Sequence, residues 1–204
     1  MADRLILLVE EPSMEAFLQN LLPRVLPAEC AFEVHAFQGK HDLLGKLPAR
    51  LLGYRYWLPA EWRIIVLVDQ DDDDCRELKA RLERAAAGAP LLSRTRAGER
   101  PWQVANRLAI EELEAWYFGE WEAVRGAYPR VSRTVPQQAR YRDADAIQGG
   151  TWEAFERVLK RCGYYTTGLR KVEAARQVAA HFDPDRSRSH SFEKLRAVIA
   201  EAAG

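Results

Sequence analysis

Residues 63–74 read RIIVLVDQDDDD, and this stretch decides the fold. Its first six residues are almost all aliphatic and mostly β-branched, which predicts a strand. The run shows no alternation of apolar and polar side chains, which is typical of parallel strands that helices cover on both faces. Five carboxylates follow within residues 69–74, so the strand is expected to end at an acidic turn.

The segments on either side continue an alternation of strands and helices. Residues 4–9 and 30–37 are further predicted strands, and a fourth is expected within residues 91–108. The helices are expected to begin at Pro12 and end before Pro27, and to span residues 40–52, 74–87 and 110–124. This order predicts an α/β fold in which right-handed crossovers place helices over a parallel sheet.

The C-terminal part is predicted to be mainly helical. Residues 128–150 have little periodicity and several turn residues, so we place a boundary there. Three helices are expected beyond it, at residues 151–161, 169–181 and 191–203. We therefore expect an α/β domain at residues 1–127 and a helical C-terminal extension, residues 128–204, packed on it.

Composition and charge limit the class of protein. The chain has 204 residues, of which 48% are hydrophobic and 29% charged, as in folded globular proteins. The formal net charge is zero, which argues against a nucleic-acid coat protein. The charge is nevertheless uneven, because residues 125–196 carry 15 Lys and Arg against 8 Asp and Glu. An acidic first part and a basic later part share one chain.

The sequence also indicates a cellular compartment. The apolar run near the N-terminus, residues 5–9, is too short for a signal peptide or a membrane span. The three cysteines have no CxxC spacing, which supports neither a disulfide framework nor a zinc site. We therefore expect a cytoplasmic protein with no membrane partner.

The acidic run after residue 68 is the strongest candidate for chemistry. Two carboxylates ~4 Å apart repel by ~1 kcal/mol in water and ~4 kcal/mol near a protein surface, and a cation would relieve this repulsion. Asp69 and Asp71, at alternate positions, can present two hard oxygen ligands to Mg²⁺ at the carboxyl edge of the sheet. A structural role at the start of the following helix is the better interpretation for Asp73 and Asp74.

Glu10 ends the strand predicted at residues 4–9 in the same way. If the first and third strands are neighbours, Glu10 comes within reach of Asp69, although 59 residues separate them. A glutamate at this position can serve as a metal ligand or as a general acid or base. Glu11, the next residue, fits a solvated loop charge better.

Several stretches resemble a bacterial Toprim-like family known as domain of unknown function 4276. They are LLVEEPSMEAFL, VLVDQDDDDC and AIEELEAWYFG, followed later by LRKVEAARQVA and DRSRSHSFEKL. The resemblance implies a Toprim-like, Rossmann-like sheet in which Glu10, Asp69 and Asp71 hold Mg²⁺ or Mn²⁺. It also favours Glu114 as a site residue within the acidic cluster of residues 111–114, where a surface helix rich in glutamate is the alternative. Glu11 departs from the family, which usually has glycine there, and so puts catalytic competence in doubt.

The basic part offers candidates for substrate binding. Lys171, Arg186 and Arg188 can contact phosphates, and Ser187, Ser189 and Ser191 can donate hydrogen bonds. The alternative is a solvated helix face whose helix is capped by Ser191.

Three functions remain open at this level. The resemblance implies a Mg²⁺-dependent nuclease of bacterial defence loci that works with an AAA-type ATPase on nucleic acid. The second hypothesis is a metal-binding subunit or sensor of that ATPase without turnover. The third, a phosphatase with an Asp-x-Asp motif, is disfavoured, because such enzymes want a small or β-branched residue where this chain has Asp73. These patterns do not determine whether the substrate is DNA or RNA, whether it is single- or double-stranded, or the oligomeric state.

Overall fold

The computed structural model describes residues 2–204. Within them, four strands form one parallel sheet in the order β2-β1-β3-β4. The strands are β1 (Arg4–Val9), β2 (Ala31–Ala36), β3 (Trp62–Asp69) and β4 (Val104–Ala109). The predicted α/β class and parallel sheet are confirmed, and β1 and β3 are neighbours.

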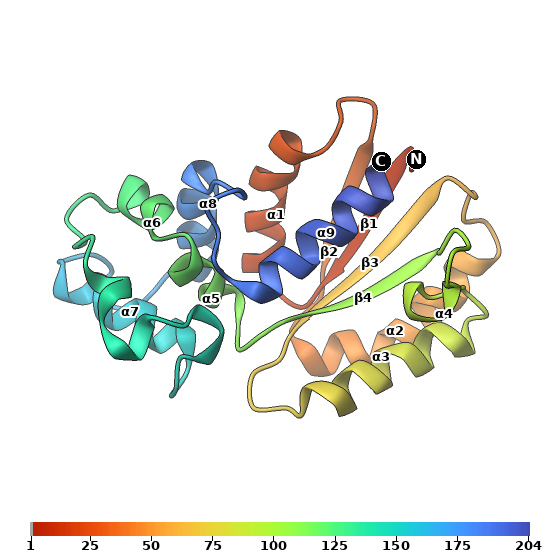
Figure 1. The fold of residues 1–204 in the computed structure, drawn as a ribbon. Helices are drawn as coiled ribbons and strands as arrows, with labels where there is room; N and C mark the ends of the chain where they lie inside the picture. Colours follow the sequence, from red (N-terminus) through yellow and green to blue (C-terminus); the bar gives the residue numbers. More distant parts are fainter. Residues whose placement is uncertain (1) are drawn as a thin grey trace.

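Helices cover both faces of the sheet. The first four are α1 (Pro12–Val25), α2 (Lys40–Arg55), α3 (Cys75–Gly88) and the short α4 (Arg94–Ala97). Because strand side chains alternate in direction, Leu5 and Leu7 enter the core shared with α1, whereas Ile6 and Leu8 enter the core shared with α2 and α3. Figure 1 shows α1 and α9 on one side of the sheet and α2 and α3 on the other.

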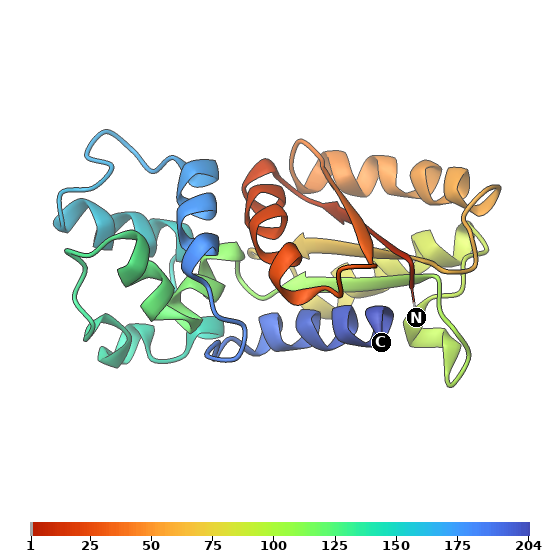
Figure 2. The ribbon, with the colours of Figure 1, turned by 90° about the horizontal axis from the view of Figure 1, so that it is seen from above.

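The remaining helices follow β4. They are α5 (Leu113–Gly119), α6 (Trp121–Ala127), α7 (Thr151–Arg161), α8 (Lys171–His181) and α9 (His190–Ala203). Three short 3-10 turns, η1 (Val135–Gln137), η2 (Ala139–Tyr141) and η3 (Ala144–Ala146), occupy the segment without periodicity. Figure 2 shows α5 to α8 gathered beyond one end of the sheet, while α9 runs back along it. No helix of residues 2–204 is long and apolar enough to cross a bilayer.

Two sequence expectations about these helices were wrong. Residues 110–112 form a loop between β4 and α5, not the start of a helix, and Glu120 separates α5 from α6. The last helix begins at His190, and its cap is Ser189, whose hydroxyl accepts a hydrogen bond from the Phe192 N–H at 3.2 Å. The division between residues 127 and 128 stays a prediction. Helix α9, from the C-terminal part, packs on the sheet, and the Ala2 N–H donates a hydrogen bond to the Ala202 carbonyl in α9 at 2.8 Å.

The packing of α5 on the loop before α9 leaves no room for a side chain at Gly119. A Cβ atom there would lie 2.8 Å from the Ser189 nitrogen. We expect Gly119→Ala to lower the free energy of unfolding by ~1–3 kcal/mol through overpacking. Gly45→Ala is the matched control, because Gly45 lies inside α2 with open space around it, and it should stabilise by ~0.5–1 kcal/mol. Urea unfolding measures both, and equal stability of Gly119→Ala and the parent would contradict this packing.

Candidate functional site

The carboxyl ends of β1 and β3 bring two acidic side chains together. Asp69 is the last residue of β3, and Glu10 directly follows β1. The Asp69 N–H donates a hydrogen bond to Glu10 Oε2 at 3.1 Å. The contact that the sequence predicted between these distant residues therefore exists, because β1 and β3 are adjacent in the sheet.

Glu114 joins them from the first turn of α5, and all three side chains are buried. The exposed fractions are 8% for Glu10, 4% for Asp69 and 1% for Glu114. Asp69 Oδ1 and Glu114 Oε2 have no hydrogen-bond partner among residues 2–204. Burying a polar atom without a partner is costly, so these two oxygens are available to bind a cation or a hydrogen-bond donor.

The electrostatics of these acids follow from burial. Burial, and then the charge of Asp71, raises the pKa of Glu10 to about 7, against the lowering effect of Lys40. Burial raises the pKa of Glu114 to about 8, although the positive charge of Lys171 opposes the shift. Burial and the charge of Glu10 raise the pKa of Asp69 well above its ordinary value. Without a cation, the cluster therefore holds protons near neutral pH.

Tyr117 lies in the same buried region and was not singled out from the sequence. It follows Glu114 by three residues on α5, its side chain is fully buried, and its hydroxyl has no partner among residues 2–204. Burial and the nearby Glu114 charge raise its pKa well above the ordinary value. The phenol is therefore a neutral hydrogen-bond donor beside the acidic cluster.

Lys40 is the second residue that sequence reasoning missed. Its ammonium group lies 2.8 Å from Asp71 Oδ2 and 2.7 Å from Asp73 Oδ2, and it donates to the Gln70 carbonyl at 2.8 Å. Burial lowers its pKa, but the hydrogen bonds to these carboxylates outweigh burial and raise it, so Lys40 stays charged. The sequence signal that could have identified Lys40 was its position directly after Gly39, which lies in the loop that follows β2. Gly39 has a φ of 96°, which suits glycine.

The loops after β3 and β4 hold each other. Asp71 and Glu111 both adopt the left-handed backbone conformation, with φ of 49° and 59°. The Asp71 N–H donates to the Glu111 carbonyl at 2.8 Å. This hydrogen bond fixes the left-handed turn at Asp71 to the loop that precedes α5.

The three glutamates within residues 111–114 have different roles. Glu112 Oε2 accepts hydrogen bonds from Thr151 Oγ1 at 2.7 Å and the Trp152 N–H at 2.8 Å, and so caps α7. Glu111 stays partly exposed, and only Glu114 enters the buried cluster. The helix predicted over residues 110–124 would have placed Glu111 and Glu112 on it, but residues 110–112 are not helical.

The residues suit a hard divalent cation in chemistry but are not closed around one. Carboxylate oxygens are the ligands that Mg²⁺ and Mn²⁺ prefer, and the two buried oxygens without partners are free to bind. Within residues 2–204, however, no three His, Cys, Asp or Glu side chains stand together as a metal site. Asp71, one of the predicted ligands, is paired with Lys40 at 2.8 Å. Metal loading would require that ion pair to open.

Lys171, predicted from the sequence as a phosphate contact, lies beside the acidic cluster. Its ammonium group is 3.8 Å from Glu11 Oε1, and although burial lowers its pKa, the charges of Glu114 and Glu11 raise it more. Glu11 also accepts a hydrogen bond from the Ser13 hydroxyl. Its φ of −141° is ordinary extended backbone, so the fold does not demand glycine there.

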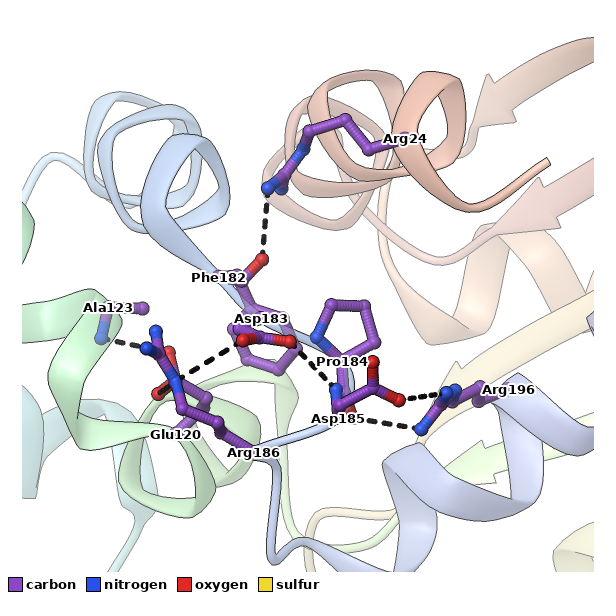
Figure 3. Close-up of polar contacts among 9 residues, drawn as sticks. All are labelled: Arg24, Glu120, Ala123, Phe182, Asp183, Pro184, Asp185, Arg186 and Arg196. Carbon is purple, nitrogen blue, oxygen red and sulfur yellow. Dashed lines mark hydrogen bonds and ion pairs between the residues drawn. The ribbon is translucent and has the colours of Figure 1, made fainter. Parts of the chain in front are cut away.

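The other two predicted phosphate contacts lie on the loop before α9. Arg186 pairs with Glu120 Oε1 at 3.1 Å and with Asp183 Oδ2 at 3.5 Å (Figure 3). The Glu120 side chain is only 2% exposed, so Arg186 is the counter-ion of a buried carboxylate and has a structural role. Arg188 is exposed, and its N–H donates to the Gly119 carbonyl at 3.0 Å.

The three serines next to these arginines are not available to a substrate. Ser187, Ser189 and Ser191 are buried, and the hydroxyls of Ser189 and Ser191 donate to Asp145 Oδ1 at 2.8 and 3.0 Å. Asp145, on η3, thus holds the first turn of α9. In Figure 3, Arg24 on α1 and Arg196 on α9 bind backbone carbonyls of this loop, at Phe182 and Pro184 respectively.

Three comparisons place the chain among known proteins. The sequence matches the family model described as "Domain of unknown function (DUF4276)" over residues 9–200. No curated protein matches it. Among solved structures, the C-terminal region of the Xanthomonas campestris pv. campestris OLD protein is similar, with 16% identity and a TM-score of 0.39 over 98% of this chain and 95% of that chain.

Proposed function

This chain belongs to the DUF4276 family, and we propose that it is a Toprim-like, metal-dependent enzyme that cleaves phosphodiester bonds in nucleic acid. The observation that carries the proposal is the pair of buried carboxylate oxygens without partners, on Asp69 and Glu114, beside Glu10 and Lys171. Buried acids next to a cationic side chain suit a site for a cation and a phosphate together.

The residues have separate roles in this proposal. Glu10, Asp69, Asp71 and Glu114 would hold Mg²⁺ or Mn²⁺, which when bound neutralises the phosphate and lowers the pKa of water. Glu10 follows the end of β1, and a glutamate at this position can serve as a general acid or base as well as a ligand; its pKa of about 7 applies to the protein without metal. Lys171 would bind the negative charge that a phosphate brings to an acidic cluster.

The cellular setting belongs to the same proposal. The Toprim resemblance supports a cytoplasmic protein of bacterial defence that works with an AAA-type ATPase. The second candidate is a metal-binding subunit or sensor of that ATPase without turnover. The ion pair between Lys40 and Asp71 favours this alternative, since a cationic side chain already binds one proposed ligand.

Cleavage of single- and double-stranded DNA and RNA by the purified protein tests the proposal. We expect cleavage with Mg²⁺ or Mn²⁺. Glu10→Gln and Asp69→Asn should each lower the cleavage rate at least ~100-fold, because each replaces a proposed metal ligand and Glu10→Gln also removes the proposed proton acceptor. Asp72→Asn is the matched control, since Asp72 lies exposed in the same acidic run. If neither the protein nor its complex with a co-purifying ATPase, supplied with ATP, cuts any of these substrates, the binding-subunit candidate replaces the enzyme.

A further inference from the structure

A cavity of about 900 Å³ lies where α5 and α6 meet the loops that precede η1 and α9. Four arginines from three segments line it, and we call it the arginine cavity: Arg133, Arg142, Arg186 and Arg188. Thr134 and Gln137 add neutral hydrogen-bonding groups. None of these residues belongs to the acidic cluster at the ends of the strands.

The positive charge of this cavity is not neutralised by its own acids. Glu120 is used by Arg186, and Glu122 Oε2 pairs with Arg125 Nη1 at 2.8 Å. The other three arginines have no carboxylate partner within residues 2–204, and all three are exposed. The cavity therefore presents a surplus of guanidinium groups, which bind phosphates through paired hydrogen bonds.

The backbone that carries these arginines is fixed before any ligand arrives. Trp121 Nε1–H donates to the Ser132 carbonyl at 2.9 Å, next to Arg133. Tyr141, next to Arg142, stacks on Phe118 with ring centres 4.9 Å apart. The backbone of Arg188 is held by the hydrogen bond that its amide N–H donates to the Gly119 carbonyl. Preorganisation of this kind reduces the entropy that binding would otherwise cost.

We propose that the arginine cavity binds phosphates of a nucleic-acid strand, through Arg133, Arg142 and Arg188, at a place separate from the acidic cluster. The arginines stand exposed around an open hollow, which suits a strand that passes through better than an enclosed small ligand. The cavity is positive, whereas the cluster is acidic, so the strand is anchored without metal. The inference rests on the proposed function for its substrate class, and Arg186 supports the site through Glu120.

Binding of a labelled single strand of ~20 nucleotides in EDTA tests the inference by fluorescence anisotropy. The variant Arg133→Ala/Arg142→Ala/Arg188→Ala should bind at least about tenfold more weakly, and the logarithmic salt slope should become shallower by up to ~2, or ~0.7 for each phosphate that is no longer neutralised. The matched control replaces three scattered exposed arginines, Arg76, Arg96 and Arg176, with alanine and removes the same charge. Circular dichroism checks that both variants fold; as the three cavity arginines form no ion pairs within the described residues, their replacement should leave the melting temperature unchanged.

Three outcomes overturn the inference. They are equal affinity of the cavity variant and the control, a binding defect that appears only with metal, and displacement of the strand by a free nucleotide at the same phosphate concentration. The last would assign the cavity to a nucleotide. Failure of the proposed function can be told apart from failure of this inference. If the parent protein cuts no strand but the cavity variant binds the strand more weakly in EDTA, the result contradicts cleavage and supports the cavity. Cleavage with an unchanged KM in the cavity variant does the reverse.

Discussion

In EDTA, the free energy of unfolding is expected to fall by several kcal/mol between about pH 5 and pH 8. Burial raises the pKa of Glu10 to about 7 and that of Glu114 to about 8, from an ordinary 4.5. Across this window the folded protein keeps protons that the unfolded chain has released. Stability that depends on bound protons is therefore present at low pH and is lost as the pH rises through the folded-state values.

Glu114→Gln isolates the contribution of one of these buried carboxyl groups to this effect. Each unit of pKa shift corresponds to ~1.4 kcal/mol, so the fully buried Glu114 accounts for on the order of a few kcal/mol of this loss of stability. The glutamine variant should be more stable than the parent at about pH 8, with a flatter pH profile in chemical denaturation. Asp72→Asn, an exposed change in the same region, should leave the slope unaltered. A parent protein whose stability rises over this range would show that the buried acids are paired in a way that the structure does not contain.

Replacement of Lys40 by methionine is expected to tighten binding of Mn²⁺ by at least about tenfold. The Lys40 ammonium group is bound to Asp71, one of the proposed ligands, and its charge opposes an incoming cation. A unit charge ~4 Å away is worth ~4 kcal/mol at a surface-like dielectric, so tenfold, or ~1.4 kcal/mol, is a conservative expectation. Without metal, the variant should be less stable than the parent, since Asp71, Asp73 and Glu10 lose their counter-charge.

Isothermal titration calorimetry and melting curves with and without Mn²⁺ measure both effects. Lys46→Met is the matched control, because Lys46 lies on the same helix and pairs with Asp42, on the exposed side of α2. Metal should raise the melting temperature of the parent, and Asp69→Asn/Asp71→Asn should abolish that rise. Metal affinity in Lys40→Met that is equal to or weaker than that of the parent would mean that Lys40 does not occupy the cation's place.

Local signals predicted much of the fold because they act over a few residues. The helix of residues 151–161 was predicted with its observed bounds, and Asp74 caps α3 as expected, since Asp74 Oδ1 accepts the N–H groups of Arg76 and Glu77 at 2.8 and 3.0 Å. Asp73, placed beside it as a helix-start charge, instead pairs with Lys40. The partner comes from another strand end, which sequence spacing does not reveal.

The position of β4 and the cap of the last helix were predicted less well, although the last helix itself was predicted to within one residue. β4 is an edge strand with polar residues such as Asn106 and Arg107, so it lacks the aliphatic run that identifies β3. The loop after it was consequently predicted as helix, which misassigned the geometry of Glu111. The alternative for this segment placed the cap of α9 at Ser191, whereas the cap is Ser189; Asp145, more than 40 residues earlier in the chain, accepts hydrogen bonds from the hydroxyls of both serines.

By itself, the sequence determined the class of fold, the acidic ends of β1 and β3, and the identities of Glu10, Asp69, Asp71 and Glu114 as candidate ligands. These follow from periodicity, strand ends and a family resemblance, all of which are written in short stretches. Only the tertiary structure decided which charges meet. It placed Lys40 on Asp71, Arg186 on buried Glu120 and Arg188 among the arginines of a cavity. Pairing of charges depends on the distances between segments far apart in the chain, and those distances exist only once the sheet and helices have packed.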